Sequence, residues 1–396
     1  MNEEKIALRK RAIQLMLNGG TKTGIAQQLG QSRLWVQRWT TRYQPDNPEG
    51  SLQDQASTPK QPYRKWSDSI RQMVLNSRQA RQEAQQPNYQ HALIGAEAIY
   101  YELRELGVSP LPPIRTIHSW LKQADRFGRK TPEVKEHPAP KPNPAPTSTA
   151  CNDLHELDLK GPFYLSGSPQ KYYLLALRDV YSKRVALGVS QDKRMETIID
   201  FLVSSWQKLG LPKVLQMDNG LKFRGSNRYP RSLGQLLRVC LDLGVEPLFI
   251  PPHEPWRNGV IENLNGLLDR LLLQQETFKD FTQLQSGTLE VETAINTTHR
   301  LPALAGKTPS EFAQNSNLQL LPQAYDWRKR DLQLVKSKVS FIRLVRKSGR
   351  ITLCANDKFE IGSDYQWQYV LAQANFATHH LDVFLQGQLI KSFDYS

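Results

Sequence analysis

Apolar residues recur at helical spacing through the first third of the chain, whereas later segments alternate apolar and polar positions. The helical spacing falls into two groups, separated by polar stretches that contain proline and glycine. These groups predict two all-α domains, and the polar stretches predict linkers without a packed core. The expected order is an all-α domain at 1–44, a linker at 45–64, a second all-α domain at 65–130 and a proline-rich linker at 131–150.

The segment 151–315 alternates strands and helices. Three runs typical of strands precede a helical run at 195–209, and two further strand–helix pairs follow. The last of these helices is expected from about 258 to 274. This order predicts an α/β domain with a mixed sheet.

The final segment, 327–396, contains short β-like runs that are broken by turn signals such as Ser348-Gly349 and Gln386-Gly387. We interpret it as a small C-terminal β-barrel. The fold expected for the whole chain is therefore multidomain: all-α, then α/β, then all-β.

The charge distribution changes this picture. The net charge is +14, and most of the excess lies in the first 150 and the last 70 residues, while the middle is balanced. Two basic flanks around a neutral centre indicate that the flanks hold a polyanion. The alternative is a basic protein with no such partner.

The chain contains no feature of a secreted or membrane protein. Its first residues are charged, and it has no apolar stretch of about 18 residues. The three cysteines, Cys151, Cys240 and Cys354, are far apart, which argues against disulfides and a cysteine-rich zinc site. We expect a cytoplasmic protein that associates with the nucleoid when it is bound to DNA.

Three carboxylates occupy positions where α/β proteins form sites. Asp158 lies on the first predicted strand, Asp218 follows the fourth, and Glu262 lies in the first turns of the last helix. Carboxylates are the ligands that Mg²⁺ and Mn²⁺ prefer, and three of them can hold two cations about 4 Å apart. Such a pair of cations catalyses displacement at a phosphodiester without a side-chain nucleophile.

Each carboxylate also has a structural alternative. Asp158 could face water, Asp218 could cap a turn with Asn219 and Gly220, and Glu262 could be a favourable acid at a helix start. Alternative ligands are Glu156, which shares a strand face with Asp158, together with Glu246 and Glu254.

The segments around these carboxylates resemble those of a known family. HELDLKG, VLQMDNGLKF and FIPPHEPWRNGVIENLNGLL, followed by NTTHRLPALAGKTPSEF, are similar to DDE transposases of the retroviral-integrase core superfamily, in their bacterial insertion-sequence or Mu-like form. The resemblance implies a ribonuclease-H-like core at 151–315. It also implies that Asp158, Asp218 and Glu262 form the catalytic, metal-binding triad, with two Mg²⁺ or Mn²⁺ ions per active site.

The chain departs from the family pattern at two places. Asp218 and Glu262 are separated by 43 residues, more than the resemblance implies, and the additional length is expected in the Arg-rich stretch 224–233. The family often has basic residues one or two turns after the Glu, whereas this chain has Asp269 and then Arg270 there.

Residues 22–43 resemble a helix-turn-helix unit. Gly30 permits the turn, Val36 and Trp39 are expected to pack inward, and residues 92–124 form a looser second match. An ordinary helical bundle is the alternative in both cases. The side chains expected to contact DNA are Gln31, Arg33, Gln37, Arg38 and Arg42 in the first unit, and Arg115, Thr116, Ser119 and Lys122 in the second.

Further DNA contacts are expected outside the helical domains. They are Lys222, Arg224, Arg228, Arg257, Asn258 and Arg270 in the core, and Arg343, Arg346 and Lys347 in the C-terminal segment.

The sequence therefore predicts a DNA transposase that binds the ends of a mobile element, cuts a strand and transfers the 3′ hydroxyl into target DNA. Its expected partners are double-stranded DNA, further copies of the chain when bound to DNA, and accessory transposition proteins. Two alternatives stay open: a DNA-binding repressor or structural factor with an inactive core, and a metal-dependent nuclease that never joins DNA.

Overall fold

The computed structural model describes residues 2–54, 66–85, 89–124, 144–220, 231–252, 254–274, 278–333, 338–353 and 357–395. The chain forms two compact units, Met1–Ser67 and Asp68–Ser396.

The first unit is helical, as its apolar spacing predicts. Ser32 caps the third helix by accepting a hydrogen bond from the Trp35 amide at 3.1 Å, and Gly30 has the left-handed backbone (φ 62°) that the preceding turn requires. Val36 and Trp39 are buried, as expected from the sequence. The helices are α1 (Asn2–Leu17), α2 (Lys22–Leu29), α3 (Arg33–Arg42) and the short α4 (Pro48–Ser51).

The helix α4 corrects the linker expected at 45–64. Asn47 caps it and Pro48 begins it, and Leu52 is buried beside Trp39. Arg9 fixes this segment by donating to the Leu52 carbonyl at 2.7 Å and pairing with Asp54 at 2.7 Å. Residues 45–54 are therefore part of the first unit, because one apolar side chain and one arginine attach them to its core.

The second unit begins with three further helices, α5 (Asp68–Gln82), α6 (Ala96–Glu105) and α7 (Ile114–Ala124). They enclose a small core that includes Ile99 and Ile117. This helical part contacts the α/β part directly. His91 Nδ1 lies 3.0 Å from the Leu271 carbonyl, and Arg300 pairs with Glu105.

A nine-stranded sheet organises the rest of the second unit, in the order β11-β10-β9-β6-β5-β4-β1-β2-β3. The central neighbours β1–β4, β4–β5 and β5–β6 are parallel, and the outer pairs are antiparallel. The strands are β1 (Leu154–Tyr164), β2 (Lys171–Asp179), β3 (Val185–Ser190), β4 (Val214–Met217), β5 (Glu246–Phe249), β6 (Lys338–Leu344), β9 (Tyr369–Asn375), β10 (His380–Leu385) and β11 (Gln388–Asp394); β7 (Arg350–Thr352) and β8 (Lys358–Glu360) form a separate hairpin.

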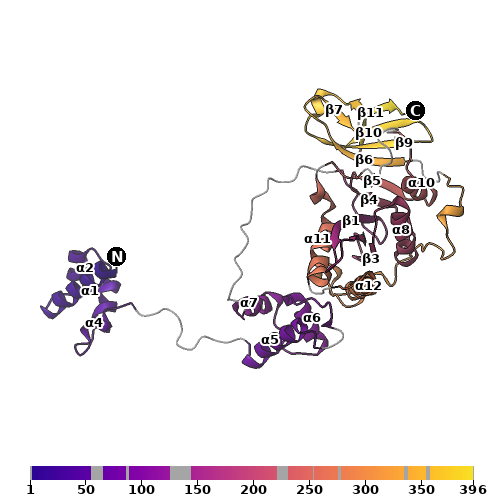
Figure 1. Ribbon diagram of the computed structural model, residues 1–396. Coiled ribbons are helices and arrows are strands. Elements are labelled where there is room, and N and C mark those ends of the chain that lie inside the picture. The colour runs from indigo at the N-terminus through magenta and orange to yellow at the C-terminus, as the bar shows by residue number, and fades with distance from the viewer. Residues whose placement is uncertain are drawn as a thin grey trace. The chain divides into compact units, whose positions relative to one another are not determined.

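Helices cover both faces of the central strands (Figure 1). Alternate residues of β2 lie on opposite faces of the sheet. Leu175 and Leu177 pack with α8 and α10 on one face, and Leu174 and Ala176 pack with α11 and α12 on the other. The helices are α8 (Met195–Leu209), α10 (Gln235–Asp242), α11 (Gly259–Leu268), α12 (Phe281–Thr297) and α13 (Pro309–Ala313), with short turns η2 (Pro255–Asn258), η4 (Pro302–Leu304), η5 (Trp327–Lys329), η6 (Ser363–Tyr365) and the π-helical turn η3 (Asp269–Leu273). This mixed sheet with two helical layers fits a ribonuclease-H-like core.

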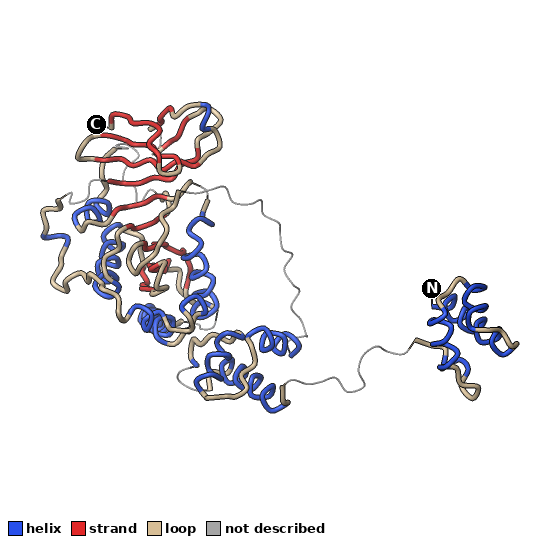
Figure 2. The backbone as a smooth tube through the Cα atoms, turned by 180° about the vertical axis from the view of Figure 1, so that it is seen from behind, coloured by secondary structure: helices blue, strands red, loops and turns tan. Residues whose placement is uncertain are grey.

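The C-terminal strands correct the expectation of a small β-barrel. Strand β6 pairs with β5 of the core, so β6, β9, β10 and β11 continue the same sheet (Figure 2). Their apolar residues, among them Phe341 and Val370, belong to the same buried cluster as Trp206 of α8. In the part of the chain that the structure describes, residues 338–395 extend the core.

Neither described cysteine is in a disulfide: Cys151 and Cys240 are free, while Cys354 lies outside the described residues. No helix among the described residues has the length and apolarity that crossing a membrane requires.

Candidate active site

Asp158 and Asp218 occupy matching positions on neighbouring parallel strands. Glu156 of β1 lies opposite Gln216 of β4, and Asp158 and Asp218 each follow this pair by two residues, with Asp218 just after β4 ends. Adjacent strands are separated by about 4.8 Å. Asp218 Oδ1 also accepts a hydrogen bond from the Gly220 amide at 2.9 Å, which gives the local turn expected from its sequence.

Helix α11 lies against the strand that carries Asp158. Asn265 Nδ2 donates to Asp158 Oδ2 at 2.6 Å, and the Ile261 amide donates to Glu156 Oε2 at 2.7 Å. These bonds come from one helix face and meet alternate residues of β1, so they fix the helix over the strand.

Glu262 follows Ile261 on this helix and is exposed. Partial burial, and then the negative charge of Asp158, raise the pKa of the Glu262 carboxyl. Repulsion between these two carboxylates means that a cation placed near both would lower the energy of the site. Because every donor is a carboxylate oxygen, the set suits a hard divalent cation.

The complete metal cluster expected from the sequence stays a prediction. Among the described residues, which include all three carboxylates, no group of three His, Cys, Asp or Glu side chains is close enough to hold a metal ion. Asp158 interacts with Glu262 and is adjacent in register to Asp218.

The three alternative ligands have other partners in the structure. Glu156 is 4% exposed, and burial raises its pKa to about 7 although it accepts from the Ile261 amide. Glu246 begins β5, at the opposite end of the strand from the site, and accepts from Ser340. Glu254 pairs with Arg257 and accepts from the Tyr369 hydroxyl at 2.6 Å.

Asp269, which occupies a position where the sequence resemblance leads one to expect a basic residue, is paired with a cation from the sheet. Lys160 Nζ of β1 lies 2.5 Å from Asp269 Oδ1, and both side chains are partly exposed. A lysine is therefore present beside this turn of the helix, although it comes from a different element.

The structure corrects three of the expected DNA contacts. Arg343 and Asn258 are buried, and the Arg257 side chain is 8% exposed. Asn258 accepts from Gln216 Nε2 at 3.0 Å, and Arg257 lies 4.1 Å over the Tyr369 ring. These polar side chains hold the strands and helix of the site together.

The other expected contacts divide by exposure. Arg42 is half-buried, with its guanidinium 5.0 Å from the Trp39 ring centre, and Gln31 and Thr116 are also half-buried. Lys222, Arg224 and Arg228 lie outside the described residues. The exposed candidates are Arg33, Gln37, Arg38, Arg115, Ser119, Lys122, Arg270, Arg346 and Lys347.

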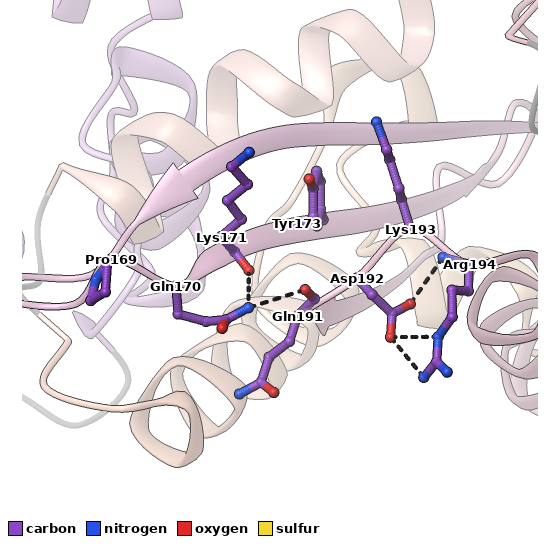
Figure 3. Close-up of a pocket in the computed structure, with 8 residues that line it drawn as sticks. All are labelled: Pro169, Gln170, Lys171, Tyr173, Gln191, Asp192, Lys193 and Arg194. Atoms are coloured by element: carbon purple, nitrogen blue, oxygen red, sulfur yellow. Dashed lines mark hydrogen bonds and ion pairs between the residues drawn. The ribbon is translucent and has the colours of Figure 1, made fainter.

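Figure 3 shows a shallow hollow between β2 and the start of α8, and none of the three carboxylates is among the residues that line it. Tyr173 lines it from the sheet face that packs with α8, whereas Asp158 lies opposite Ala176 on the other face. Within it, Arg194 pairs with Asp192 at 2.9 Å. The hollow therefore does not belong to the candidate active site.

Sequence reasoning missed two contributors to the site. Asn265 could have been found, because it lies three residues after Glu262 and such pairs share a helix face. Arg343 carried no such signal, because its place depends on the pairing of β6 with β5, about 90 residues away in the chain.

Two family models match parts of the chain. One, described as "Integrase core domain", covers residues 243–309, which include Glu262. The other, described as "Putative ATPase subunit of terminase (gpP-like)", covers residues 7–58.

A curated relative and two solved structures are also similar. The Gag-Pro-Pol polyprotein of bovine leukemia virus (isolate Australian) is 27% identical over 128 residues, which is 32% of this chain and 8% of the polyprotein. The HTLV-2 integrase catalytic core in complex with magnesium (trimeric form) is 20% identical over 42% of this chain and 99% of that chain, with a TM-score of 0.32. The simian T-cell lymphotropic virus intasome in complex with PP2A regulatory subunit B56 gamma is 16% identical in sequence. The similarity covers 75% of this chain and 92% of that chain, with a TM-score of 0.40.

The family model and the viral relative show that a segment of this chain, residues 243–309 in the case of the model, is similar to integrase cores. This chain spans only a small part of the viral polyprotein that it matches.

Proposed function

We propose that this protein is a DNA transposase of the DDE type, which binds the ends of a mobile element and catalyses strand cleavage and 3′-hydroxyl strand transfer. The observation that carries the proposal is that α11, the helix that bears Glu262, is fixed over β1 by the hydrogen bond from Asn265 to Asp158 at 2.6 Å. Asp218 follows the adjacent strand at the matching position.

The residues around these carboxylates prepare the site. Asn265 orients Asp158, and Glu156 accepts from the start of α11 so that Glu262 is presented on its exposed side. Asp158, Asp218 and Glu262 are the proposed ligands of two Mg²⁺ or Mn²⁺ ions. When bound, such ions activate the attacking oxygen and neutralise charge that develops on the phosphate oxygens.

In the proposed reaction a water oxygen attacks the phosphodiester at the element end and releases a 3′ hydroxyl. That hydroxyl then attacks a phosphodiester of target DNA, forms the new bond and releases a target 3′ hydroxyl. No described side chain is required to form a covalent intermediate with DNA.

The proposed DNA contacts are made by exposed arginine and lysine side chains. The exposed arginines of α3 and of α7 are proposed to bind the element ends, and the C-terminal Arg346 and Lys347 to contact phosphates. Joining two ends requires more than one copy of the chain, and accessory transposition proteins are proposed partners. The proposed location is the bacterial cytoplasm, on the nucleoid.

The test uses the purified full chain, DNA carrying the inverted repeats that flank its gene, and Mg²⁺ or Mn²⁺. Asp218→Asn is expected to reduce strand transfer about a hundredfold or more while end binding persists, because an acidic ligand becomes neutral. Asp364→Asn, at an exposed aspartate of the C-terminal segment, is the matched control and is expected to act like the parent.

Three other results would contradict the proposal. Strand transfer that persists in Asp218→Asn would refute the triad. Hydrolysis without joined products would identify a nuclease, and end-specific binding without cleavage under either metal would identify a DNA-binding factor.

A further inference from the structure

Arg343 lies on β6 in the C-terminal segment, yet its side chain ends at Asn219, the residue that follows Asp218. It is 2% exposed, and its guanidinium donates to Asn219 Oδ1 at 2.8 Å. We propose that Arg343 is a positioning residue for Asp218, so that the C-terminal strands complete the candidate active site. This inference rests on the proposed function.

The register of the sheet explains how a distant residue reaches this place. Phe341 of β6 lies opposite Phe249 near the end of β5, and β6 continues beyond that end. Arg343, two residues later, therefore stands at the edge of the sheet where β4 ends and Asp218 follows. Parallel strands β4, β5 and β6 bring their carboxyl ends to this one edge.

The hydrogen bonds of Arg343 use all five of its donors. One reaches Asn219, and four reach backbone carbonyls on β6, at the end of β5 and on the β7 hairpin. The carbonyls are Thr352 (from Nε, 2.9 Å), Ile250 (Nη1, 3.2 Å), Ile342 (Nη1, 2.9 Å) and Leu353 (Nη2, 3.1 Å). The planar guanidinium thus joins three segments at one point.

The segment that carries Asp218 is held from both sides by this arrangement. Before Asp218, the Met217 carbonyl accepts from the Ile250 amide at 3.2 Å. After it, Asn219 Nδ2 donates to the Ile250 carbonyl, while Asn219 Oδ1 accepts from Arg343. Ile250 and Arg343 therefore fix the backbone on both sides of the proposed ligand.

Lysine cannot replace this arginine. It has three donors on a single nitrogen, so it cannot span carbonyls on three segments in one plane. Arg343→Lys keeps the positive charge and most of the volume but leaves several buried acceptors unpaired. We expect the Asp218 backbone to lose its fixed position.

The experiment measures Mn²⁺ binding to the full chain by the electron paramagnetic resonance signal of free Mn²⁺. Arg343→Lys and Asn219→Ala are expected to weaken Mn²⁺ binding about tenfold, as happens when the support of a metal ligand is removed. Strand transfer should then require more Mn²⁺ and recover in part at high Mn²⁺. Loss of folding alone would lower the rate at every Mn²⁺ concentration without this shift.

Arg350→Lys is the matched control. Arg350 lies on the adjacent β7 and pairs at the surface with Glu360 at 3.1 Å, where such pairs contribute little. It is expected to bind Mn²⁺ like the parent. The double variant Arg343→Lys/Asn219→Ala should be little worse than Arg343→Lys alone, because both changes remove the hydrogen bond between these two residues.

The outcomes separate this inference from the proposed function. If Asp218→Asn loses Mn²⁺ binding and strand transfer but Arg343→Lys and Asn219→Ala behave like Arg350→Lys, the inference is refuted and the proposed function stands. If Asp218→Asn retains both, the proposed function fails as well. Should Arg343→Lys not give a thermal unfolding transition, Asn219→Ala decides, because it leaves the four bonds of Arg343 to carbonyls in place.

Discussion

Two glutamates near the site differ in role because of their surroundings. Glu156 and Glu262 both lie at the interface of β1 and α11, but Glu156 is 4% exposed whereas Glu262 is exposed. Glu156 accepts from a helix amide and from Gln216 Nε2 at 3.3 Å, so its oxygens serve the fold. Burial, more than residue type, separates a structural acid from a proposed ligand.

Replacing Glu156 by Gln is expected to change how stability depends on pH. Burial raises the pKa of Glu156 from 4.5 to about 7, so the folded chain holds this proton more tightly than the unfolded chain. The free energy of unfolding that this proton contributes is therefore fully present below about pH 4.5. It is lost as the pH rises to about 7, by up to about 3 kcal/mol. Calorimetry of the core transition at pH 5 and pH 7.5 measures the difference.

Glu156→Gln should lose less stability than the parent over this interval, because the amide never ionises. Glu97→Gln, at an exposed position on α6, is the control and should follow the parent. An equal loss in Glu156→Gln and the parent would show that the pH dependence does not come from this carboxyl.

At the level of elements, α3 combines a buried and an exposed face. Val36 and Trp39 pack inward, and Arg9 lies 3.8 Å over the Trp39 ring. Arg33 and Arg38 are exposed on the same helix. This is the arrangement that a helix needs to enter a DNA groove without losing its own packing.

Arg33→Ala and Arg38→Ala should each weaken binding of the element end without unfolding the unit. A plot of log affinity against log salt concentration has a negative slope. If the arginine contacts a phosphate, each change should reduce the magnitude of that slope by about one. Binding to end DNA is measured by fluorescence anisotropy at several salt concentrations. Lys5→Ala on α1 is the control, and an effect as large from it would contradict a specific role for α3.

At the scale of the whole molecule, a single sheet within the second unit joins the candidate active site to the C-terminal strands. Phe341 and Val370 of these strands are buried with Trp206 and Phe249 of the core. Burial of each such side chain stabilises the fold by about 2 kcal/mol, so several of them match the total stability of a typical domain. The C-terminal strands are therefore expected to be required for folding of the core.

A chain that ends at residue 333 should lose the cooperative unfolding transition of the core and aggregate, because it exposes the edge of β5. A chain that lacks residues 1–67, a separate compact unit, should keep that transition. Calorimetry and size-exclusion chromatography compare the two. A soluble, cooperatively folded 1–333 chain would show that the shared sheet is not needed for core stability.

The sequence predicted most elements of the central domain because their signals are local. Helix α8 was expected at 195–209 and is found at Met195–Leu209. Helix α12 was not expected, and α11 ends at Leu268 rather than near 274, where a π-helical turn follows. Strands β8 and β11 were also missed, since a strand of three residues or one with an exposed pattern carries little periodicity.

By itself, the sequence determined the order of most elements, the inward face of α3 and the three carboxylates as candidates, because periodicity, caps and motif spacing act over a few residues. The tertiary structure alone decided that the last strands continue the core sheet, that Asn265 binds Asp158, and that Arg343 is buried beside Asn219. These contacts join residues about 90 or more positions apart. Their partners depend on which strand edges meet, and no local pattern in the chain encodes that choice.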